Sequence, residues 1–391
     1  MLKHFFIFFH KLRHLSIILL GLTYLVSVNV SASTDTTQPP IKFDRLTVAD
    51  GLSQNSTYSI TQDQQGFIWI ATQDGLNRYD GEHFVQYRKN NSDPNSIADN
   101  FIRKVFIDNT NTLWVGTENG LSKYNRKTDN FENFYTSTDD SNTLSDNLIW
   151  DIYQDNNGML LVSTEAGLHK YNNKDNHFVR IRFRGFENKL TAIKTIFQDH
   201  NNNYWLGTFE NGIYISNSKF QNTFSLQENN PWQLNIPVNK LLDIKRVNND
   251  YWLGTDNGVY IIDPDYQQKH QVVNELTSNF VRSIEPFNDN ETWIGTQNGL
   301  NRINNFSYQI EHIEAHNHPK SLSNNWIMDI FTDDNKNTWF ASYEGLNYIN
   351  NQQFLLTHHL FNYQNNNTQV ESIAETTNGN LWFRTNYIVT N

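Results

Sequence analysis

Short apolar runs separated by polar turns follow one another in an order that returns along the chain. The stretch Gly66–Tyr79, for example, recurs with the same order of apolar, Thr, Gly and aromatic positions as Thr112–Tyr124 and as Met159–Tyr171. Self-similarity at a period of about 45 residues indicates a repeat protein whose units bury their faces against one another. Eight copies align on one position, which holds Trp in every copy but the third. These positions are Trp69, Trp114, Leu161, Trp205, Trp252, Trp293, Trp339 and Trp382.

Each repeat predicts four short strands. The first is an apolar stretch such as Ile149–Tyr153, which is followed by a turn such as Asp155–Gly158. The second contains the aligned Trp, and its last Thr leads into a tight turn where a Gly such as Gly120 can adopt positive φ. The third ends in Tyr, and the fourth is an outer aromatic segment such as Phe131–Tyr135. Four strands with one Trp and one Gly predict an all-β fold, a β-propeller of four-stranded antiparallel blades over residues 41–391.

The number of blades depends on how the two ends of the repeat region pair. Phe43–Leu46 stands where later repeats have their outer strand, and the last repeat stops after Leu381–Thr385 and a third strand at Tyr387–Thr390. If the N-terminal strand completes that last repeat, the ring has eight blades and no open edge. Alternatively, seven repeats form complete blades and the eighth is the incomplete start of a second propeller. The sequence leaves both arrangements open.

The first residues of the chain are unlike the repeats. Basic residues near the start precede the apolar run Leu15–Val30, and Ala32 ends a cleavage-site pattern. This order predicts a secretory signal peptide at 1–32, a linker at 33–40, and therefore an exported, periplasmic protein. An uncleaved N-terminal membrane anchor is the alternative, although the apolar run is shorter than the ~20 residues that a span needs.

Composition and motifs narrow the functions that this fold can carry. The net charge of −11 argues against a nucleic-acid partner, because phosphate binding needs a basic surface. The chain contains neither Cys nor a catalytic or phosphate-binding motif, so no enzyme activity, cofactor or metal is expected. His312, His316 and His318 lie close enough together to hold a metal, but a solvated loop is expected there.

The repeat pattern Asp-x-x-Gly-x-Leu/Ile-Trp-Ile/Val-Gly-Thr-x-x-Gly-Leu-x-Arg/Lys-Tyr, joined by loops such as Asp93–Asn100, resembles the two-component regulator propeller family over about residues 41–388. The resemblance implies a sensor in the periplasm of Gram-negative bacteria that binds a small-molecule ligand such as an oligosaccharide. In that family the propellers act through a membrane helix on a histidine kinase or a diguanylate cyclase. Because no such output domain follows here, we expect either a truncated receptor without its C-terminal output domain or a secreted module that signals through a membrane partner.

A ligand site is expected where the repeats differ, because the residues they share build the fold. The shared Trp is expected in the core, since one large ring per blade fills the space between neighbouring sheets. The repeats differ most at the second residue of the first strand, which in a propeller borders the central channel. This position holds Tyr58, Arg103, Trp150, Lys194, Leu242, Arg282, Met328 and Glu371.

Every one of these residues but the leucine is a candidate for ligand binding. Arg103, Lys194 and Arg282 suit a carboxylate or a sulfate, and Tyr58 or Trp150 suits the face of a sugar ring. Ordinary contacts between blades are the alternative explanation for the differences.

Two other functions are open. A secreted propeller enzyme such as a lyase needs an acid–base pair at the channel, and a structural interaction module needs a large exposed apolar patch.

Overall fold

The computed structural model of the chain describes residues 41–350, except 141, 187–191 and 229, and the backbone of four short strands between 362 and 385. The expected signal peptide and linker, residues 1–32 and 33–40, lie outside the described residues. Within the described part, no helix is long and apolar enough to cross a membrane.

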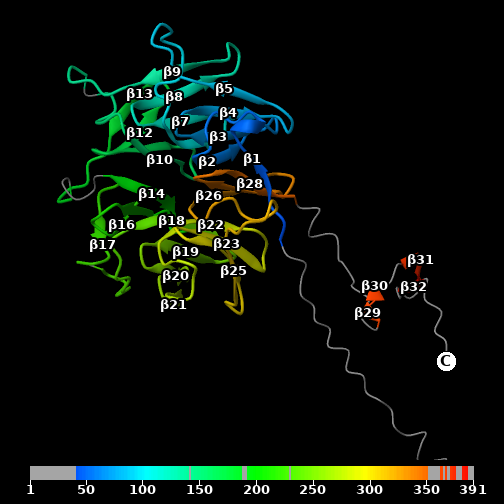
Figure 1. Cartoon of the computed structure of the whole chain (residues 1–391). Helices are drawn as coiled ribbons and strands as arrows, with labels where there is room; N and C mark the ends of the chain where they lie inside the picture. The colour runs from blue at the N-terminus through cyan, green and yellow to red at the C-terminus, as the bar shows by residue number, and fades with distance from the viewer. Residues whose placement is uncertain are drawn as a thin grey trace, which may run out of the picture. The chain divides into compact units, whose positions relative to one another are not determined.

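The strands form seven four-stranded antiparallel sheets, the blades of a propeller (Figure 1). Six blades take four consecutive strands each, and the innermost strand of every blade packs beside that of the next. Blades 1 to 3 are β2–β5 (Thr57–Gln62, Ile68–Thr72, Gly75–Tyr79, Phe84–Tyr87), β6–β9 (Ile102–Ile107, Leu113–Thr117, Gly120–Asn125, Asn130–Phe134) and β10–β13 (Ile149–Gln154, Leu160–Thr164, Gly167–Asn172, His177–Arg180).

The remaining blades repeat the same order. Blades 4 to 6 are β14–β17 (Ile193–Gln198, Tyr204–Thr208, Ile213–Ser216, Thr223–Ser225), β18–β21 (Leu241–Val247, Asp250–Thr255, Gly258–Ile262, Gln268–Val272) and β22–β25 (Val281–Pro286, Glu291–Thr296, Gly299–Asn304, Ile310–Ile313). Blade 7 consists of β26, β27 and β28 (Ile327–Thr332, Thr338–Ser342, Gly345–Ile349) with β1 (Asp44–Leu46) as its outer strand. A short 3-10 helix, η1 (Val48–Asp50), follows β1.

The ring is closed by β1, which pairs antiparallel with β28. The amide of Phe43 donates to the carbonyl of Lys320 at 2.9 Å, and the guanidinium of Arg45 donates to carbonyls of the same loop. In blade 2 the amide of Phe131 likewise donates to the carbonyl of Asn95 in the incoming loop, at 2.8 Å. The loop that enters a blade thus covers part of its outer edge, which leaves fewer unpaired groups for another chain.

Seven blades account for the ring, and the seven-blade alternative fits the structure. The N-terminal strand does complete a blade, but the blade is that of the seventh repeat. Because β26 packs directly against β2, the ring has no place for an eighth inner strand, and the eight-bladed alternative is not confirmed. In the eighth repeat, β31 (Val370–Glu375) and β32 (Leu381–Thr385) pair with each other in a separate sheet, as do β29 (Asn362–Tyr363) and β30 (Asn366–Asn367).

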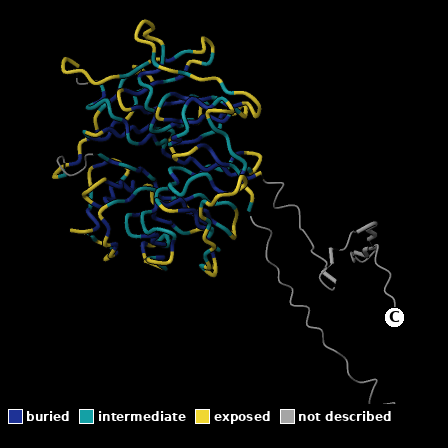
Figure 2. The backbone as a smooth tube through the Cα atoms, viewed as in Figure 1, coloured by how far each residue is buried: buried dark blue, intermediate teal, exposed yellow. Residues whose placement is uncertain are grey.

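The residues that the repeats share make up the core. In the second strand of blades 1 to 4 and 7 every residue is buried. The six aligned Trp residues of the ring and Leu161 of blade 3 are at most 5% exposed, which confirms their expected place in the core. Figure 2 shows that buried residues run through the blades, whereas exposed residues gather at the loop tips.

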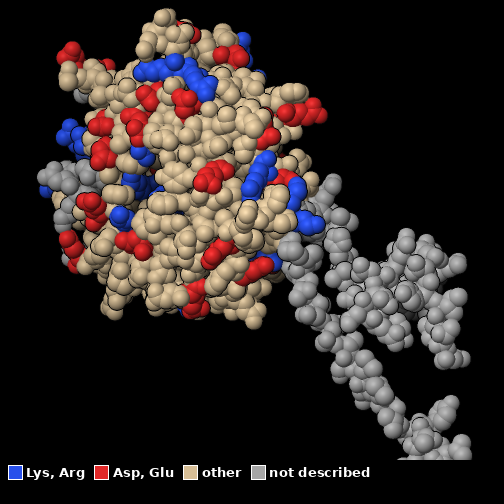
Figure 3. All heavy atoms as spheres, in the orientation of Figure 1, with Lys and Arg blue, Asp and Glu red and all other residues tan. Residues whose placement is uncertain are grey.

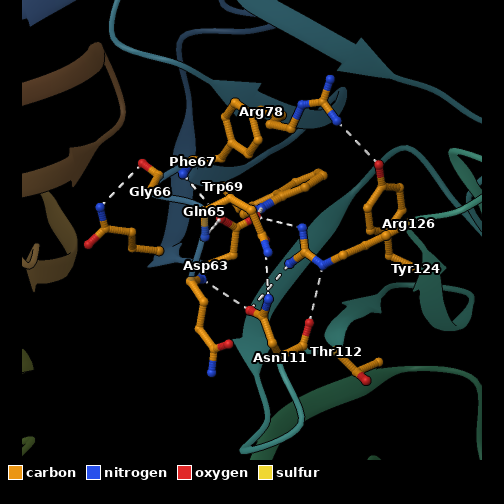
Figure 4. A network of polar contacts seen from close by, with 12 residues as sticks. Asp63, Gln65, Gly66, Phe67, Trp69, Arg78, Asn111, Thr112, Tyr124 and Arg126 are labelled. Carbon is orange, nitrogen blue, oxygen red and sulfur yellow. Dashed lines mark hydrogen bonds and ion pairs between the residues drawn. The ribbon is translucent and has the colours of Figure 1, made fainter.

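A buried Asp after the first strand accepts a hydrogen bond from the indole of the aligned Trp. In blade 1 the carboxylate of Asp63 accepts from Trp69 Nε1 at 2.7 Å and from Arg126 of the next blade at 2.8 Å (Figure 4). It also accepts backbone amides of its own turn, so one side chain fixes the turn, the Trp and the seam to blade 2. The same Asp–Trp bond joins Asp108 to Trp114, Asp199 to Trp205, and Asp333 to Trp339.

Two blades that lack this Asp–Trp pair show what happens to one group when the other is missing. Blade 3 has Leu161 in place of Trp, and its Asp155 accepts instead from the hydroxyl of Tyr204 in blade 4, at 2.6 Å. Blade 6 has Trp293 but Asn288 in the turn after its first strand, and the buried Nε1 of Trp293 has no acceptor among the described residues. A buried acceptor is thus reused by a neighbour when its own Trp is missing.

In blades 3, 5, 6 and 7, the side chain on the third residue of the inner strand ties the blade to the next one. The carboxylate of Asp329 accepts the amide of Ile60 at 3.0 Å and so joins blade 7 to blade 1. Asp151 and Asp243 accept the corresponding amides of the blades that follow them at 3.0 and 2.8 Å, and the hydroxyl of Ser283 does so at 3.0 Å. These bonds hold the inner strands, and the side chains that border the channel, in fixed positions.

A buried polar side chain on the third strand anchors the loop that enters a blade. The side chain of Asn77 accepts the amide of Ser53 at 2.8 Å, and His169 Nε2 accepts the amide of Ser145 at 3.0 Å. Ser122, Asn301 and Asn347 make the corresponding bond in their own blades. These loops are therefore each anchored to the third strand of the blade they enter.

Candidate functional site

Every inner strand of the ring is irregular at its second residue. In β6, Ile102 pairs with Thr117 and Lys104 pairs with Gly116, so Arg103 between them has no partner across the sheet. The other six inner strands show the same shift. Such a β-bulge changes the direction of the side chain of the extra residue. The bulged residues are Tyr58, Arg103, Trp150, Lys194, Leu242, Arg282 and Met328, which are the positions where the repeats differ most.

These seven side chains converge on one cavity of about 480 Å³ at the centre of the ring. Six of the seven candidate binding residues from the sequence are among them: Tyr58, Arg103, Trp150, Lys194, Arg282 and Met328. The seventh candidate, Glu371, lies on β31 in the separate two-stranded sheet. The side chain of Glu371 lies outside the described residues.

Two further rows of side chains border the mouth of this cavity and were missed in the sequence. One residue precedes each inner strand, and the other follows the last Thr or Ser of the second strand. In blade 2 these two are bonded, because the amide of Glu118 donates to the carbonyl of Phe101 at 3.1 Å. Both rows vary between repeats as the bulged position does, which is the signal that could have identified them. The first row supplies Phe101, Lys240, Phe280 and Trp326, and the second supplies Phe209 and Tyr343.

Cations and aromatic rings alternate around the mouth. The guanidinium of Arg103 lies 4.4 Å from the ring centre of Trp150, and the ammonium of Lys194 contacts the same ring. The ammonium groups of Lys194 and Lys240 lie 4.6 and 4.1 Å from the ring centre of Phe209. Each cation is therefore packed against a ring contributed by a neighbouring blade.

The alternation continues through blades 6 and 7. The guanidinium of Arg282 lies 5.3 Å from the ring centre of Phe280 and 5.2 Å from that of Trp326. Trp326 packs on Tyr343 with ring centres 5.2 Å apart, and Tyr343 packs on Tyr58 at 6.1 Å. Aromatic contacts between blades 7 and 1 thus complete the ring of cations and aromatic side chains around the mouth.

These contacts decide which rings are open to a ligand. Trp150 contacts two cations and its indole N–H donates to Glu165 at 2.6 Å, while Tyr58 packs against neighbouring rings. Phe209 and Tyr343 are more open, with 40% and 36% of their surface exposed. The stacking expected for Trp150 and Tyr58 therefore suits Phe209 and Tyr343 better.

The mouth carries four cations, and only one of them has a carboxylate partner within the described part of the chain. Arg103 forms an ion pair with Glu118, whereas Lys194, Lys240 and Arg282 form none with a described residue. Burial, together with repulsion from Arg103, lowers the pKa of Lys194 to about 6. Burial likewise lowers the pKa of Arg282. The charges of this mouth are thus incompletely balanced by the protein.

Three buried donors at the mouth also have no acceptor among the described residues. They are Nε of Arg103, Nε of Arg282 and Nε1 of Trp326. A buried donor without an acceptor costs roughly 1–3 kcal/mol, which a bound acceptor can recover. Unpaired donors next to positive charge suit the oxygen atoms of an anionic group.

In the channel beyond the mouth, lysines lie beside carboxylates. Lys104 Nζ lies 3.1 Å from a carboxylate oxygen of Asp151, and Lys245 Nζ lies 4.0 Å from Glu285. Burial disfavours the charge of Lys104, but Asp151, Asp329 and Asp243 together outweigh burial and raise the lysine pKa. Asp243 raises the pKa of Lys245 more strongly than burial lowers it, and burial raises the pKa of Glu285 to about 7. Here each lysine has its own carboxylates.

Two of the three clustered histidines make polar contacts with nearby described residues. His312 Nε2 lies 2.8 Å from the carbonyl oxygen of Glu275, and His318 Nδ1 accepts the amide of Lys320 at 3.1 Å. On the face shown in Figure 3, acidic and basic side chains are interspersed. Among the described residues, the most exposed large apolar side chain is Phe306, at 68%.

Comparison with known proteins agrees with the repeat pattern. The family described as Two component regulator propeller matches residues 51–74 and 143–166. Histidine kinase P4 of Formosa agariphila is 48% identical over 56 residues, which make up 14% of this chain and 4% of that protein. These matches confirm the resemblance of the repeats to the two-component regulator propeller.

Solved structures share the architecture. The extracellular domain of a hybrid two component system from B. thetaiotaomicron is 26% identical with a TM-score of 0.71, over 88% of this chain and 47% of that one. The chain therefore spans about half the length of that relative. Virginiamycin B lyase from Staphylococcus aureus is 13% identical with a TM-score of 0.59, over 79% of this chain and 98% of the lyase. At that identity the likeness concerns the fold alone.

Proposed function

We propose that this chain, which carries two-component regulator propeller repeats, is the exported, ligand-binding sensor part of a bacterial signalling receptor. The proposed sensor is non-enzymatic, and its signal is the occupancy of the central cavity by a small ligand, an oligosaccharide with acidic groups. The likeness to an extracellular domain of a hybrid two component system supports the sensor role and a place outside the cytoplasm. A histidine kinase or a diguanylate cyclase, in the same protein or in a membrane partner, receives the signal.

One observation carries the binding site in this proposal. Seven bulges aim the side chains that differ most between repeats into a single cavity, on inner strands whose backbones are alike. A rigid scaffold with variable side chains at one place is the usual arrangement of a binding site. The unpaired cations suit a carboxylate or a sulfate, and the exposed ring of Phe209 suits a sugar face.

Calorimetric titration of the protein with neutral, uronic-acid and sulfated oligosaccharides tests the proposal. We expect saturable binding of an acidic member. Arg103→Ala should weaken it about 10- to 100-fold, because a hydrogen bond to a charged group contributes roughly 1.5–3 kcal/mol. Trp150→Ala should also weaken binding, since its ring supports Arg103 and Lys194.

A matched control lies on the same kind of strand. Arg246 is exposed on β18, and its guanidinium donates to Asn248 and Asn249 rather than bordering the cavity, so Arg246→Ala should leave binding unchanged. Absence of binding heat across the panel would count against the proposal. Release of unsaturated oligosaccharide products during the titration would instead identify the protein as a lyase.

A further inference from the structure

Three lysines border the central channel, and they differ in their partners. Lys104 and Lys245 lie beside carboxylates, as described above. Lys194 forms neither an ion pair nor a hydrogen bond with any residue in the described part of the chain. Its Nζ contacts the ring of Trp150 and lies 4.6 Å from the ring centre of Phe209, at the edge of the cavity. The described part of the fold therefore makes no polar use of this amine.

The surroundings of Lys194 disfavour its charge. The amine is buried at the mouth beside Arg103, Arg282 and Lys240, all of which are cations that repel an ammonium group. Glu165 acts in the opposite direction, but its carboxylate already accepts the indole N–H of Trp150. With its pKa lowered to about 6, most of this amine is uncharged at neutral pH. The aromatic face of Trp150 favours the ammonium form and offsets only part of this effect.

An uncharged amine that faces a cavity lined by cations has a specific reactivity. The lone pair of a neutral lysine adds to carbonyl carbons, and desolvation beside other cations is a known way of preparing such an amine. The guanidinium groups of Arg103 and Arg282 have buried Nε donors for which no described residue supplies an acceptor. Their natural partner is a carboxylate. The cavity thus combines an amine nucleophile with groups that would hold a carboxylate next to a carbonyl.

We propose that Lys194 captures an anionic carbonyl compound, an aldehyde acid or a 2-oxo acid, as a reversible imine in the central cavity. This inference rests on the proposed function, because it assigns chemistry to the same cavity. It narrows the ligand to one that presents a carboxylate close to a free aldehyde or ketone. The open-chain end of an acidic sugar belongs to this class.

The reaction balances without an oxidant or a reductant. Nζ of Lys194 forms a bond to the carbonyl carbon, and the carbonyl oxygen takes up a proton to give a carbinolamine. The nitrogen lone pair then expels that oxygen as water, and a C=N bond remains. The two protons that the amine loses leave with the oxygen, so amine and carbonyl give imine and water. Hydrolysis reverses each step and releases the ligand.

Reductive trapping on the wild-type protein tests this inference. Glyoxylate serves as the carbonyl probe, and sodium cyanoborohydride converts an imine into a stable carboxymethyl-lysine that peptide mass spectrometry locates. At pH 7 an amine with a pKa near 6 is about 90% uncharged, against less than ~0.1% for an ordinary lysine. We therefore expect Lys194 to be modified at least ~100-fold faster than exposed lysines such as Lys127.

The pH profile separates this chemistry from simple accessibility. Between pH 7 and 9 the rate at Lys194 should stay nearly constant, whereas that of exposed lysines should rise about 100-fold as their uncharged fraction grows. Lys194→Arg replaces the amine with a guanidinium of similar length that forms no imine with the probe, and it should abolish the cavity label. Lys245→Arg should keep the label, because Lys245 has carboxylate partners and takes no part. Circular dichroism and thermal melting of both variants verify that the fold is retained.

The outcomes distinguish this inference from the proposed function. Labelling that follows exposure alone, or a 100-fold rise at Lys194 between pH 7 and 9, would overturn the imine. Saturable binding of an acidic oligosaccharide without any label at Lys194 would also overturn it, but would leave the sensor proposal standing. Selective labelling of Lys194 together with no binding of any oligosaccharide would support the imine and remove the oligosaccharide from the proposed function.

Discussion

The Asp that supports the aligned Trp offers a sharp test of how the blades are stabilised. Asp333 is 4% exposed, and its carboxylate accepts from Trp339 Nε1 at 2.9 Å, from the Asn337 side chain at 3.0 Å and from the Asn337 amide at 2.8 Å. The next residue, Asp334, is exposed, and no described residue bonds to its carboxylate. Asp333→Ala and Asp334→Ala are therefore a matched pair of substitutions in one turn.

The expected cost of Asp333→Ala follows from the groups that lose their acceptor. Trp339 is 5% exposed, so its indole N–H cannot regain a full water contact and costs roughly 1–3 kcal/mol. The Asn337 donors lie at a turn where water can replace the carboxylate, so they add only about 1 kcal/mol. We expect a loss of about 2–4 kcal/mol in the free energy of unfolding for Asp333→Ala, and less than about 0.5 kcal/mol for Asp334→Ala.

Urea unfolding followed by Trp fluorescence measures both values. A lower midpoint with an unchanged slope assigns the loss to the native state. Asp333→Asn keeps one acceptor oxygen and should fall between the wild type and Asp333→Ala. Equal midpoints for the Asp333→Ala and Asp334→Ala proteins would refute the reasoning, because the exposed Asp would then matter as much as the buried one.

Two further predictions concern buried positions. Burial lowers the pKa of His169 to about 4, and its Nε2 must stay unprotonated to accept from Ser145. The unfolded imidazole takes up a proton near pH 6.5, so stability is lost as pH falls below that value. From pH 7 to pH 5, the wild type should therefore lose about 2 kcal/mol more of its free energy of unfolding than His169→Asn does, as measured by urea unfolding. The same pH dependence in both proteins would contradict this. A Cβ on Gly207 would lie 2.7 Å from Cβ of Leu241 in the next blade and still closer to its carbonyl oxygen. Gly207→Ala should cost about 1–3 kcal/mol or more by the same assay, although blade 1 has Ala71 at this position, and an unchanged midpoint would argue against close packing there.

The sequence predicts the position of a site residue within its repeat, but not the contacts that this residue makes with adjacent repeats. The bulged position could be identified because the repeats agree around it and differ at it, and the structure brings Arg103 and Lys194 together as a result. That other side chains cover the ring of Trp150 could not be predicted. Its ring is occupied by cations from two adjacent repeats, and those residues meet it only because the ring sets the bulges side by side.

The number of blades was open for a similar reason. A strand such as Asp44–Leu46 carries the pattern of an outer strand, but that pattern says nothing about which third strand it pairs with. Both the seventh and the eighth repeat offer one in sequence. The choice is made by closure, because β26 packs on β2 and Asp329 accepts the amide of Ile60 across that seam. Closure is a property of seven accumulated packing angles, which no single repeat contains.

Within a repeat, the residues that stabilise the blade and its seams differ from those that border the cavity, so one blade can change without the others. The hydroxyl of Tyr204 donates to Asp155 of the preceding blade in place of the indole N–H that this blade lacks, and the hydroxyl of Tyr251 accepts the backbone amide of His200 in the preceding blade. Stability in such a ring is a sum of blade and seam contributions, so a loss in one repeat is offset at its seam with the next. The bulged residues make none of the seam hydrogen bonds of Asp151, Asp243 and Asp329, and their contacts with neighbouring blades are with the side chains at the mouth of the cavity. Substitutions at the cavity should therefore alter what is bound while the free energy of unfolding stays nearly constant, which is the property that lets a sensor scaffold acquire new ligands.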